Sequence, residues 1–172
     1  DNSILDEGKY YFDIEAYLSF DGVLDNILSI DSINIPLNVT NKKNTDNYSF
    51  DIQGSNEKII KKTLDNYSMN YNILYKGKLS NPKIYVSLLK KSVLSALDVS
   101  YKQININDYT SNNLTLYKDN MYLLVDNKND FNNKITINLK PNSLDYNLYK
   151  LRFYLYDNDK MISFTDKAFI TK

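Results

Sequence analysis

The sequence predicts an all-β protein built as an antiparallel β-sandwich, with extra strands and one short helix. Apolar residues recur at every second position in about ten segments, and Asn- and Asp-rich turn signals separate these segments roughly every 8–12 residues. The composition is poor in the helix formers Ala, Glu and Arg and rich in Ile, Tyr and Asn, which disfavours a helical bundle. Alternation that is apolar on one side only is typical of antiparallel sheets.

The first fifty residues are predicted to contain a leader and three strands. Residues 1–8 lack periodicity and are expected to form a loose leader, with 9–172 forming a single β-sandwich domain. Segment 9–20 alternates strictly, which predicts a strand with an inward face made of Phe12, Ile14, Ala16, Leu18 and Phe20. Segment 33–40 also alternates, with Ile33, Ile35, Leu37 and Val39 predicted to point inward. Pro36 on the opposite face indicates a sheet edge or a bulge. Segment 48–53 is the third strand.

The middle of the chain contains two predicted strands and the helix candidates. Segment 56–66 fits either a short helix capped by Asn56 or a strand, and the pattern does not choose between them. Segment 67–77 alternates, and its inward face is predicted to carry Tyr67, Met69, Tyr71, Ile73 and Tyr75. Segment 83–90 is predicted to be a strand. Segment 92–98 is the best helix candidate, because its apolar residues are three and four positions apart.

The last seventy residues are predicted to form six strands. Segments 101–106, 113–117 and 121–126 are short and follow one another after polar turns. Segment 133–140 alternates again, and segment 148–157 has an inward face that is predicted to carry Tyr149, Leu151, Phe153 and Leu155. Asp157–Asn158–Asp159 is expected to form a tight hairpin turn before the final strand, 160–171.

Charge does not suggest a nucleic-acid or membrane partner. The 21 basic and 21 acidic residues cancel, and the lysines occur as scattered pairs instead of a basic patch. No apolar run approaches the roughly 20 residues that span a bilayer. Residues 1–80 hold 8 basic and 12 acidic groups, while 81–172 hold 13 and 9. The change of sign near 77–82 marks a seam at which two smaller domains could meet, although halves of this size would bury little surface.

Composition also disfavours an enzyme. Cys, Trp and His are absent, which excludes disulfides, thiolate or imidazole metal sites and every nucleophile–His arrangement. The three Glu residues are far apart in the sequence, and most Asp residues occur in turn segments, where they bond to local backbone. We therefore expect no cofactor and no metal. The best calcium candidates are two Asp-rich clusters, which we interpret as ordinary turns: Asp126, Asp130, Asp157 and Asp159.

One stretch near the end of the chain has a family resemblance. Leu139-Lys140-Pro141, followed by Tyr149-Lys150-Leu151-Arg152-Phe153, resembles the L-x-P … Y-x-L-x-F ending of immunoglobulin-like and fibronectin-type domains. Residues 137–171 are also similar to the end of immunoglobulin-like modules in surface proteins of low-GC Gram-positive bacteria. The resemblance implies a tyrosine corner, in which a Tyr hydroxyl bonds to upstream backbone. Tyr149 is the first candidate for it and Tyr146 the second.

These observations lead to two functional hypotheses. The first is a non-catalytic, extracellular or cell-surface module of a bacterial protein, acting in adhesion or as a structural spacer in an assembly. Its partner would be a protein or a glycan at a cell surface, and self-association is one form that such an assembly could take. The alternative is a carbohydrate-binding module that stacks sugars on exposed aromatic rings, for which the candidates are Tyr11, Tyr17, Tyr154 and Tyr156.

Overall fold

The computed structural model describes residues 8–19, 27–39, 48–54, 59–92, 100–126 and 130–172. In these ranges the chain forms strands and two short 3₁₀ turns, with no α-helix, and the all-β sandwich class is confirmed. The 3₁₀ turns are Ile106–Asp108 and Pro141–Ser143. The strands are β1 (Gly8–Ser19), β2 (Ile27–Val39), β3 (Tyr48–Gly54), β4 (Ile59–Ile60), β5 (Tyr67–Gly77), β6 (Pro82–Lys91), β7 (Tyr101–Ile104), β8 (Thr115–Lys118), β9 (Met121–Asp126), β10 (Phe131–Leu139), β11 (Leu148–Asp157) and β12 (Lys160–Thr171).

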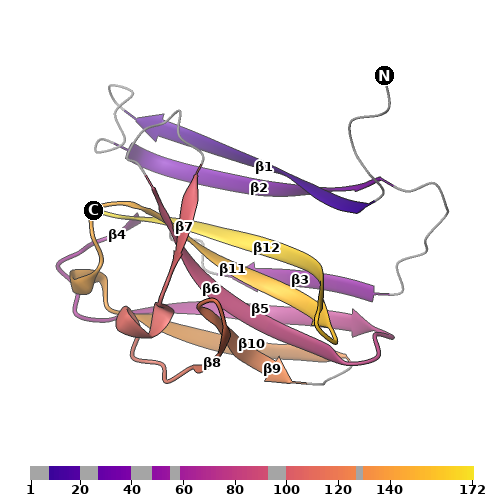
Figure 1. Ribbon diagram of the computed structural model, residues 1–172. Coiled ribbons are helices and arrows are strands. Elements are labelled where there is room, and N and C mark those ends of the chain that lie inside the picture. Colours follow the sequence, from indigo (N-terminus) through magenta and orange to yellow (C-terminus); the bar gives the residue numbers. More distant parts are fainter. Residues whose placement is uncertain (1–7, 20–26, 40–47, 55–58, 93–99, 127–129) are drawn as a thin grey trace.

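The strands belong to three sheets. The largest has the order β4-β12-β11-β6-β9-β8, with β7 pairing to β6 beside this path, and the second has the order β10-β5-β3. The third sheet is the β1–β2 pair, here called the hairpin. The hairpin lies beside β12, as Figure 1 shows. Every pairing is antiparallel except that of β4 with β12, which is parallel.

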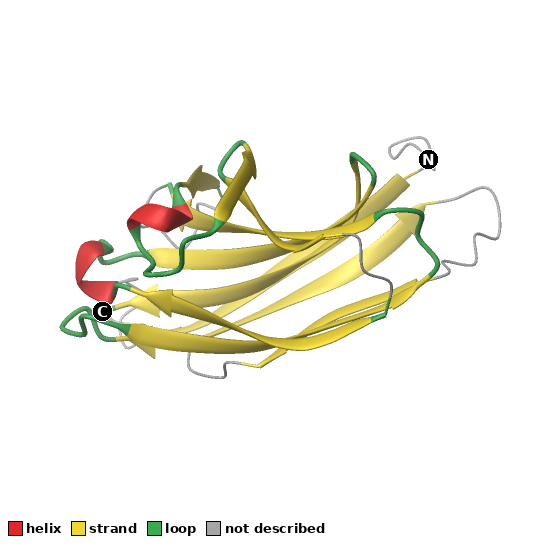
Figure 2. Ribbon diagram, turned by 90° about the horizontal axis from the view of Figure 1, so that it is seen from below, coloured by secondary structure: helices red, strands yellow, loops and turns green. Residues whose placement is uncertain are grey.

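The main core fills the space between the large sheet and the three-stranded sheet (Figure 2). On β11, the predicted inward residues Tyr149, Leu151, Phe153 and Leu155 are all buried. On β5, Met69, Tyr71, Ile73 and Tyr75 are buried as predicted, whereas Tyr67 at the start of the strand is only partly buried. The two sets meet where the rings of Tyr71 and Phe153 pack edge to face, with their centres 5.1 Å apart. Period-two alternation therefore identified both inner faces of the sandwich.

Local backbone chemistry explains the tight connections. The β8–β9 turn places Asp119 and Asn120 at positive φ, and the β11–β12 turn does the same with Asn158. Asn and Asp tolerate this left-handed conformation better than other residues that carry a side chain. Gly54 has a φ of 121°, and a Cβ there would lie 2.3 Å from the carbonyl oxygen of Asn70. Only glycine fits at that position.

The structure assigns one of the segments that the sequence pattern leaves open. Of the ambiguous segment 56–66, residues 59–60 form β4, and no helix occurs in its described part, 59–66. The helix expected at 92–98 lies almost entirely outside the described residues, as does nearly all of the leader, because β1 begins at Gly8. Residues 77–82 connect the three-stranded sheet to the large sheet, and the main core draws on strands from both sides of this connection.

Candidate interaction surface

The hairpin attaches to the large sheet through a tyrosine and an asparagine. The Tyr11 ring packs on Phe164 of β12 with 4.1 Å between the ring centres, and its hydroxyl donates a hydrogen bond to the Ser163 hydroxyl over 2.9 Å. The Asn34 side-chain oxygen accepts a hydrogen bond from the backbone N–H of Asp166 over 2.9 Å. One aromatic contact and two hydrogen bonds thus join the described part of the hairpin to β12.

Beneath the hairpin lies a buried group of charges on β11 and β12. The Asp166 carboxylate is fully buried and accepts two 2.7 Å hydrogen bonds from the Arg152 guanidinium. The Lys150 ammonium, also buried, lies 3.7 Å from the same carboxylate and 4.3 Å from the centre of the Tyr101 ring. Arg152 and Asp166 are direct register partners. A bidentate bond of this kind fixes strand register as well as balancing charge.

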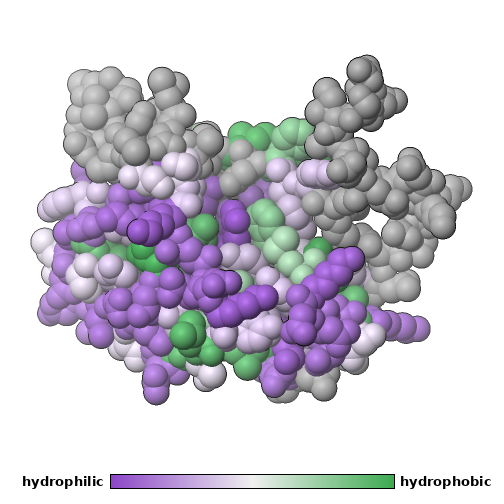
Figure 3. Space-filling view, viewed as in Figure 1, coloured by the Kyte–Doolittle hydropathy of each residue, from purple (hydrophilic) through white to green (hydrophobic). Residues whose placement is uncertain are grey.

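The outer face of the hairpin is apolar and exposed. Phe12 pairs with Ile35 and Ile14 pairs with Ile33, so the four side chains are neighbours on two adjacent cross-strand pairs. Their exposed fractions are 59% and 42% for the first pair, and 51% and 57% for the second. We call these four residues the apolar face. The space-filling view shows hydrophobic atoms at this edge of the molecule (Figure 3).

The prediction that Phe12, Ile14 and Ala16 point into the core is therefore wrong, and so is the same prediction for Ile33 and Ile35 on β2. The side chains of Leu18 and Phe20 lie outside the described part. Alternation separates the two faces of the strand correctly, but it does not show which face is covered by the rest of the protein. The side toward the sheet meets the buried charges, and burying polar or charged groups costs free energy unless they are hydrogen-bonded. Tyr11 and Asn34 can form such bonds, whereas Phe and Ile cannot. Tyr11 is accordingly packed on Phe164, not presented to solvent, and the side chain of Tyr17 lies outside the described part.

The tyrosines at the far end of the same sheet face are also covered. Tyr154 and Tyr156 are each 8% exposed and pack with Tyr85 and Met121, so the expectation that they project into solvent is wrong. The reason is that β11 lies between β12 and β6 in the large sheet, and side chains from neighbouring strands of this sheet pack around the two rings. Sequence reasoning missed Tyr117, whose ring stacks on Tyr85 with 4.5 Å between centres. Burial, with Tyr117 nearby, raises the pKa of Tyr85 to about 12.

The four calcium candidates take part in local contacts that do not converge. Asp130 accepts a hydrogen bond from the Gly77 N–H over 3.2 Å, and Asp157 accepts one from the Asn81 N–H over 2.7 Å. Asp159 accepts from the Tyr117 hydroxyl over 2.9 Å, and Asp126 lies 3.6 Å from Lys83. Among the described residues, no three acidic side chains come close enough together to hold a metal ion.

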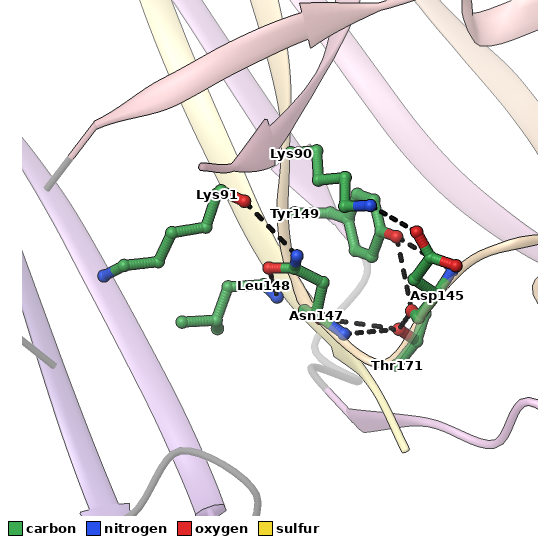
Figure 4. Close-up of polar contacts among 7 residues, drawn as sticks. All are labelled: Lys90, Lys91, Asp145, Asn147, Leu148, Tyr149 and Thr171. Carbon is green, nitrogen blue, oxygen red and sulfur yellow. Dashed lines mark hydrogen bonds and ion pairs between the residues drawn. The ribbon is translucent and has the colours of Figure 1, made fainter. Parts of the chain in front are cut away.

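Tyr149 joins the start of β11 to the chain just before it (Figure 4). Its hydroxyl donates to the backbone carbonyl of Asp145 over 3.2 Å and accepts from the backbone N–H of the same residue over 3.1 Å. Burial is the main cause that raises the pKa of Tyr149. The Thr171 backbone N–H donates to the Asn147 carbonyl, and the Asn147 backbone N–H donates to the Thr171 hydroxyl. These two bonds attach the end of β12 to the same corner. Tyr146, the second candidate for this role, is largely exposed.

Replacing Tyr149 with phenylalanine should lower the free energy of unfolding by about 1–2 kcal/mol. The ring stays in the core, while the Asp145 backbone N–H loses its hydroxyl partner and the Asp145 carbonyl keeps the bond from the Thr171 hydroxyl. Urea denaturation of the variant and the wild type measures the difference. Tyr146→Phe is the matched control, because its hydroxyl is removed from a ring that is 60% exposed. Equal stability of the two variants would contradict a structural role for the Tyr149 hydroxyl.

Comparison of the chain with models of known protein families finds no match, and comparison with curated proteins finds none either. Within the described residues, no helix has the length and apolar character needed to cross a bilayer. Of the surfaces described above, the apolar face of the hairpin is the most unusual.

Proposed function

We propose that the chain is a non-catalytic module of a bacterial surface or secreted protein, acting in adhesion or as a structural spacer in an assembly. The observation that carries the proposal is the apolar face of the hairpin. Exposed apolar residues that occur singly are normal, but a contiguous group on one sheet face is typical of an interaction site. A broad β-sandwich with long strands supplies the rigid base that such a surface needs.

The polar side chains of the described residues support a structural role in preference to catalysis. General acid–base chemistry needs carboxylates held near one another in a cleft, with one pKa raised. Here Asp166 is bonded to Arg152, and Asp157 and Asp159 bond to neighbouring loops and side chains. The Lys90 ammonium bonded to Asp145 lowers the pKa of that carboxyl. Each of these carboxylates therefore takes part in a structural contact.

The carbohydrate hypothesis receives less support from the same geometry. A stacking platform must present the face of an aromatic ring to the sugar, but Tyr154 and Tyr156 are buried and Tyr11 packs on Phe164. The partly exposed Tyr117 ring is stacked on Tyr85 on one side, and its other contacts include the ammonium of Lys118 at 5.3 Å. A glycan array showing saturable binding that Tyr117→Ala abolishes would favour this alternative over adhesion through the hairpin.

Surface location is tested by antibody labelling of the cells that produce the chain. Labelling of intact cells, or recovery of the chain from culture medium, is the expected result. Labelling that appears only after the cells are permeabilised would contradict the proposal. A cytosolic protein of the same organism, labelled in parallel, shows that the intact cells were closed to antibody.

A further inference from the structure

We propose that the apolar face of the hairpin binds the apolar face of a second copy of this chain, forming a weak face-to-face dimer. This inference rests on the proposed function and names the partner of that surface. Four features carry it: the contiguity of the apolar face, the charge of the strands around it, the symmetry of the pairing, and the area that would be buried.

The apolar face differs from the other exposed apolar residues of the described chain in being continuous. Phe12, Ile14, Ile33 and Ile35 occupy two cross-strand pairs that follow each other on one face of the hairpin, where side chains directly opposite are within contact distance. In contrast, Leu116 on β8 and Met161 on β12 lie on different strands of the large sheet. A second sheet face packed on the hairpin would cover all four residues at once, as in a sandwich.

The charge of the two strands favours a protein partner over a lipid surface. The sequences of β1 and β2 contain one basic residue, Lys9, against three acidic residues, Asp13, Glu15 and Asp31. Peripheral attachment to anionic bilayers normally combines apolar residues with a surrounding group of lysines and arginines. An apolar face set in net acidic strands lacks that attraction, so a second apolar protein face is the better fit.

The hairpin is also suited to pairing with itself. A two-fold axis between the faces, running across the strands, would bring the Phe12–Ile35 pair of one copy onto the Ile14–Ile33 pair of the other. Every apolar side chain then meets an apolar side chain, and the contact is isologous.

The buried area sets the expected strength. Side chains of this size that are about half exposed present roughly 100 Å² each, or roughly 400 Å² for each copy. A dimer would bury roughly 800 Å² in total, below the roughly 1,200 Å² at which specific stable interfaces begin. We therefore expect a dissociation constant in the range of about 10 µM to 1 mM. Such an affinity becomes effective when many copies are held close together, because neighbouring contacts then act at high local concentration.

Sedimentation velocity over about 10 µM to 1 mM tests the dimer. The wild type should show a weight-average sedimentation coefficient that rises with concentration toward the dimer value. The variant Phe12→Ser/Ile33→Ser should associate at least about tenfold more weakly. Leu116→Ser is the matched control, because it removes a side chain that is 58% exposed but lies on β8, and it should associate like the wild type. Added salt should not weaken the association, since no ion pair drives it.

Each other result would overturn the dimer. A wild type that stays monomeric at 1 mM, or a control that loses association to the same extent as the double variant, contradicts it. Binding of the wild type, but not the double variant, to neutral phosphatidylcholine vesicles would assign the face to lipid instead. Ile14→Lys tests the same surface should the double variant fail to fold, as judged by circular dichroism. A monomeric chain on the outside of intact cells would refute the dimer and leave the surface location standing.

Discussion

Replacing Asp166 with alanine is expected to destabilise the protein by about 3–5 kcal/mol. The carboxylate is fully buried and contacts two cations, Arg152 and the buried Lys150. Removing it leaves those positive charges in the protein interior without this counter-charge. Burying unbalanced charge costs more free energy than the intact ion pair contributes to stability. The substitution should also loosen the hairpin, because Asn34 bonds to the backbone of the same residue.

Urea denaturation of Asp166→Ala measures this effect, with Asp126→Ala as the control. Asp126 also faces a lysine, Lys83 at 3.6 Å, but its side chain is exposed, and exposed pairs contribute about 0–1 kcal/mol. A loss for Asp166→Ala that is no larger than the loss for Asp126→Ala would show that the buried charges are solvated in solution. Binding of a hydrophobic dye by the folded variant would report loosening of the hairpin.

Phe153→Ala should cost about 3–5 kcal/mol of stability. Phe153 is fully buried at the centre of β11, and its ring packs edge to face with Tyr71 across the core. The substitution removes the ring from water-excluded surroundings and leaves a cavity between the two sheets, which the β-sandwich can close only in part. The buried Tyr71 ring also loses an aromatic partner.

The same substitution on the hairpin supplies the matched control. Phe12→Ala deletes an identical side chain from a position that is 59% exposed, so its cost should stay below about 1 kcal/mol. Thermal and urea unfolding of both variants give the comparison. If Phe12→Ala proved as destabilising as Phe153→Ala, the hairpin would be packed with its apolar face inward, and the dimer proposed above would lose its surface.

The strands of the sandwich could be predicted from sequence because period-two alternation is a local property. β5, β10 and β11 each show it, and the structure buries the expected residues on β5 and β11. Alternation does not show whether one face or both faces of a strand are covered. β11 carries aromatic and aliphatic residues on both sides, as in Tyr154 and Leu155, which is typical of a strand covered on two faces. That signal was present in the sequence and would have placed Tyr154 and Tyr156 in the interior.

The hairpin shows a second limit of sequence patterns. Its polar and apolar sides were separated correctly, but the choice between them depends on Arg152 and Asp166, more than 110 residues further along the chain. Likewise Tyr117 became a stacking partner of Tyr85 only through the order of β8, β9 and β6 in the sheet. Contacts with residues this distant in the sequence do not change the hydrophobic periodicity of the segment that they cover.

The parallel pairing of β4 with β12 affects how the protein can fold. Ile59 is paired with Ile170, and the backbone of Lys172 bonds to both Ile60 and Lys62 over 2.9 Å. This edge of the large sheet thus forms only after residues 59–62 and residues 170–172 have both been synthesised. Proteins dominated by pairings so distant in sequence fold over milliseconds to seconds, much more slowly than helical bundles. The nascent chain is consequently expected to emerge open and to close its sandwich late, in a single concerted step.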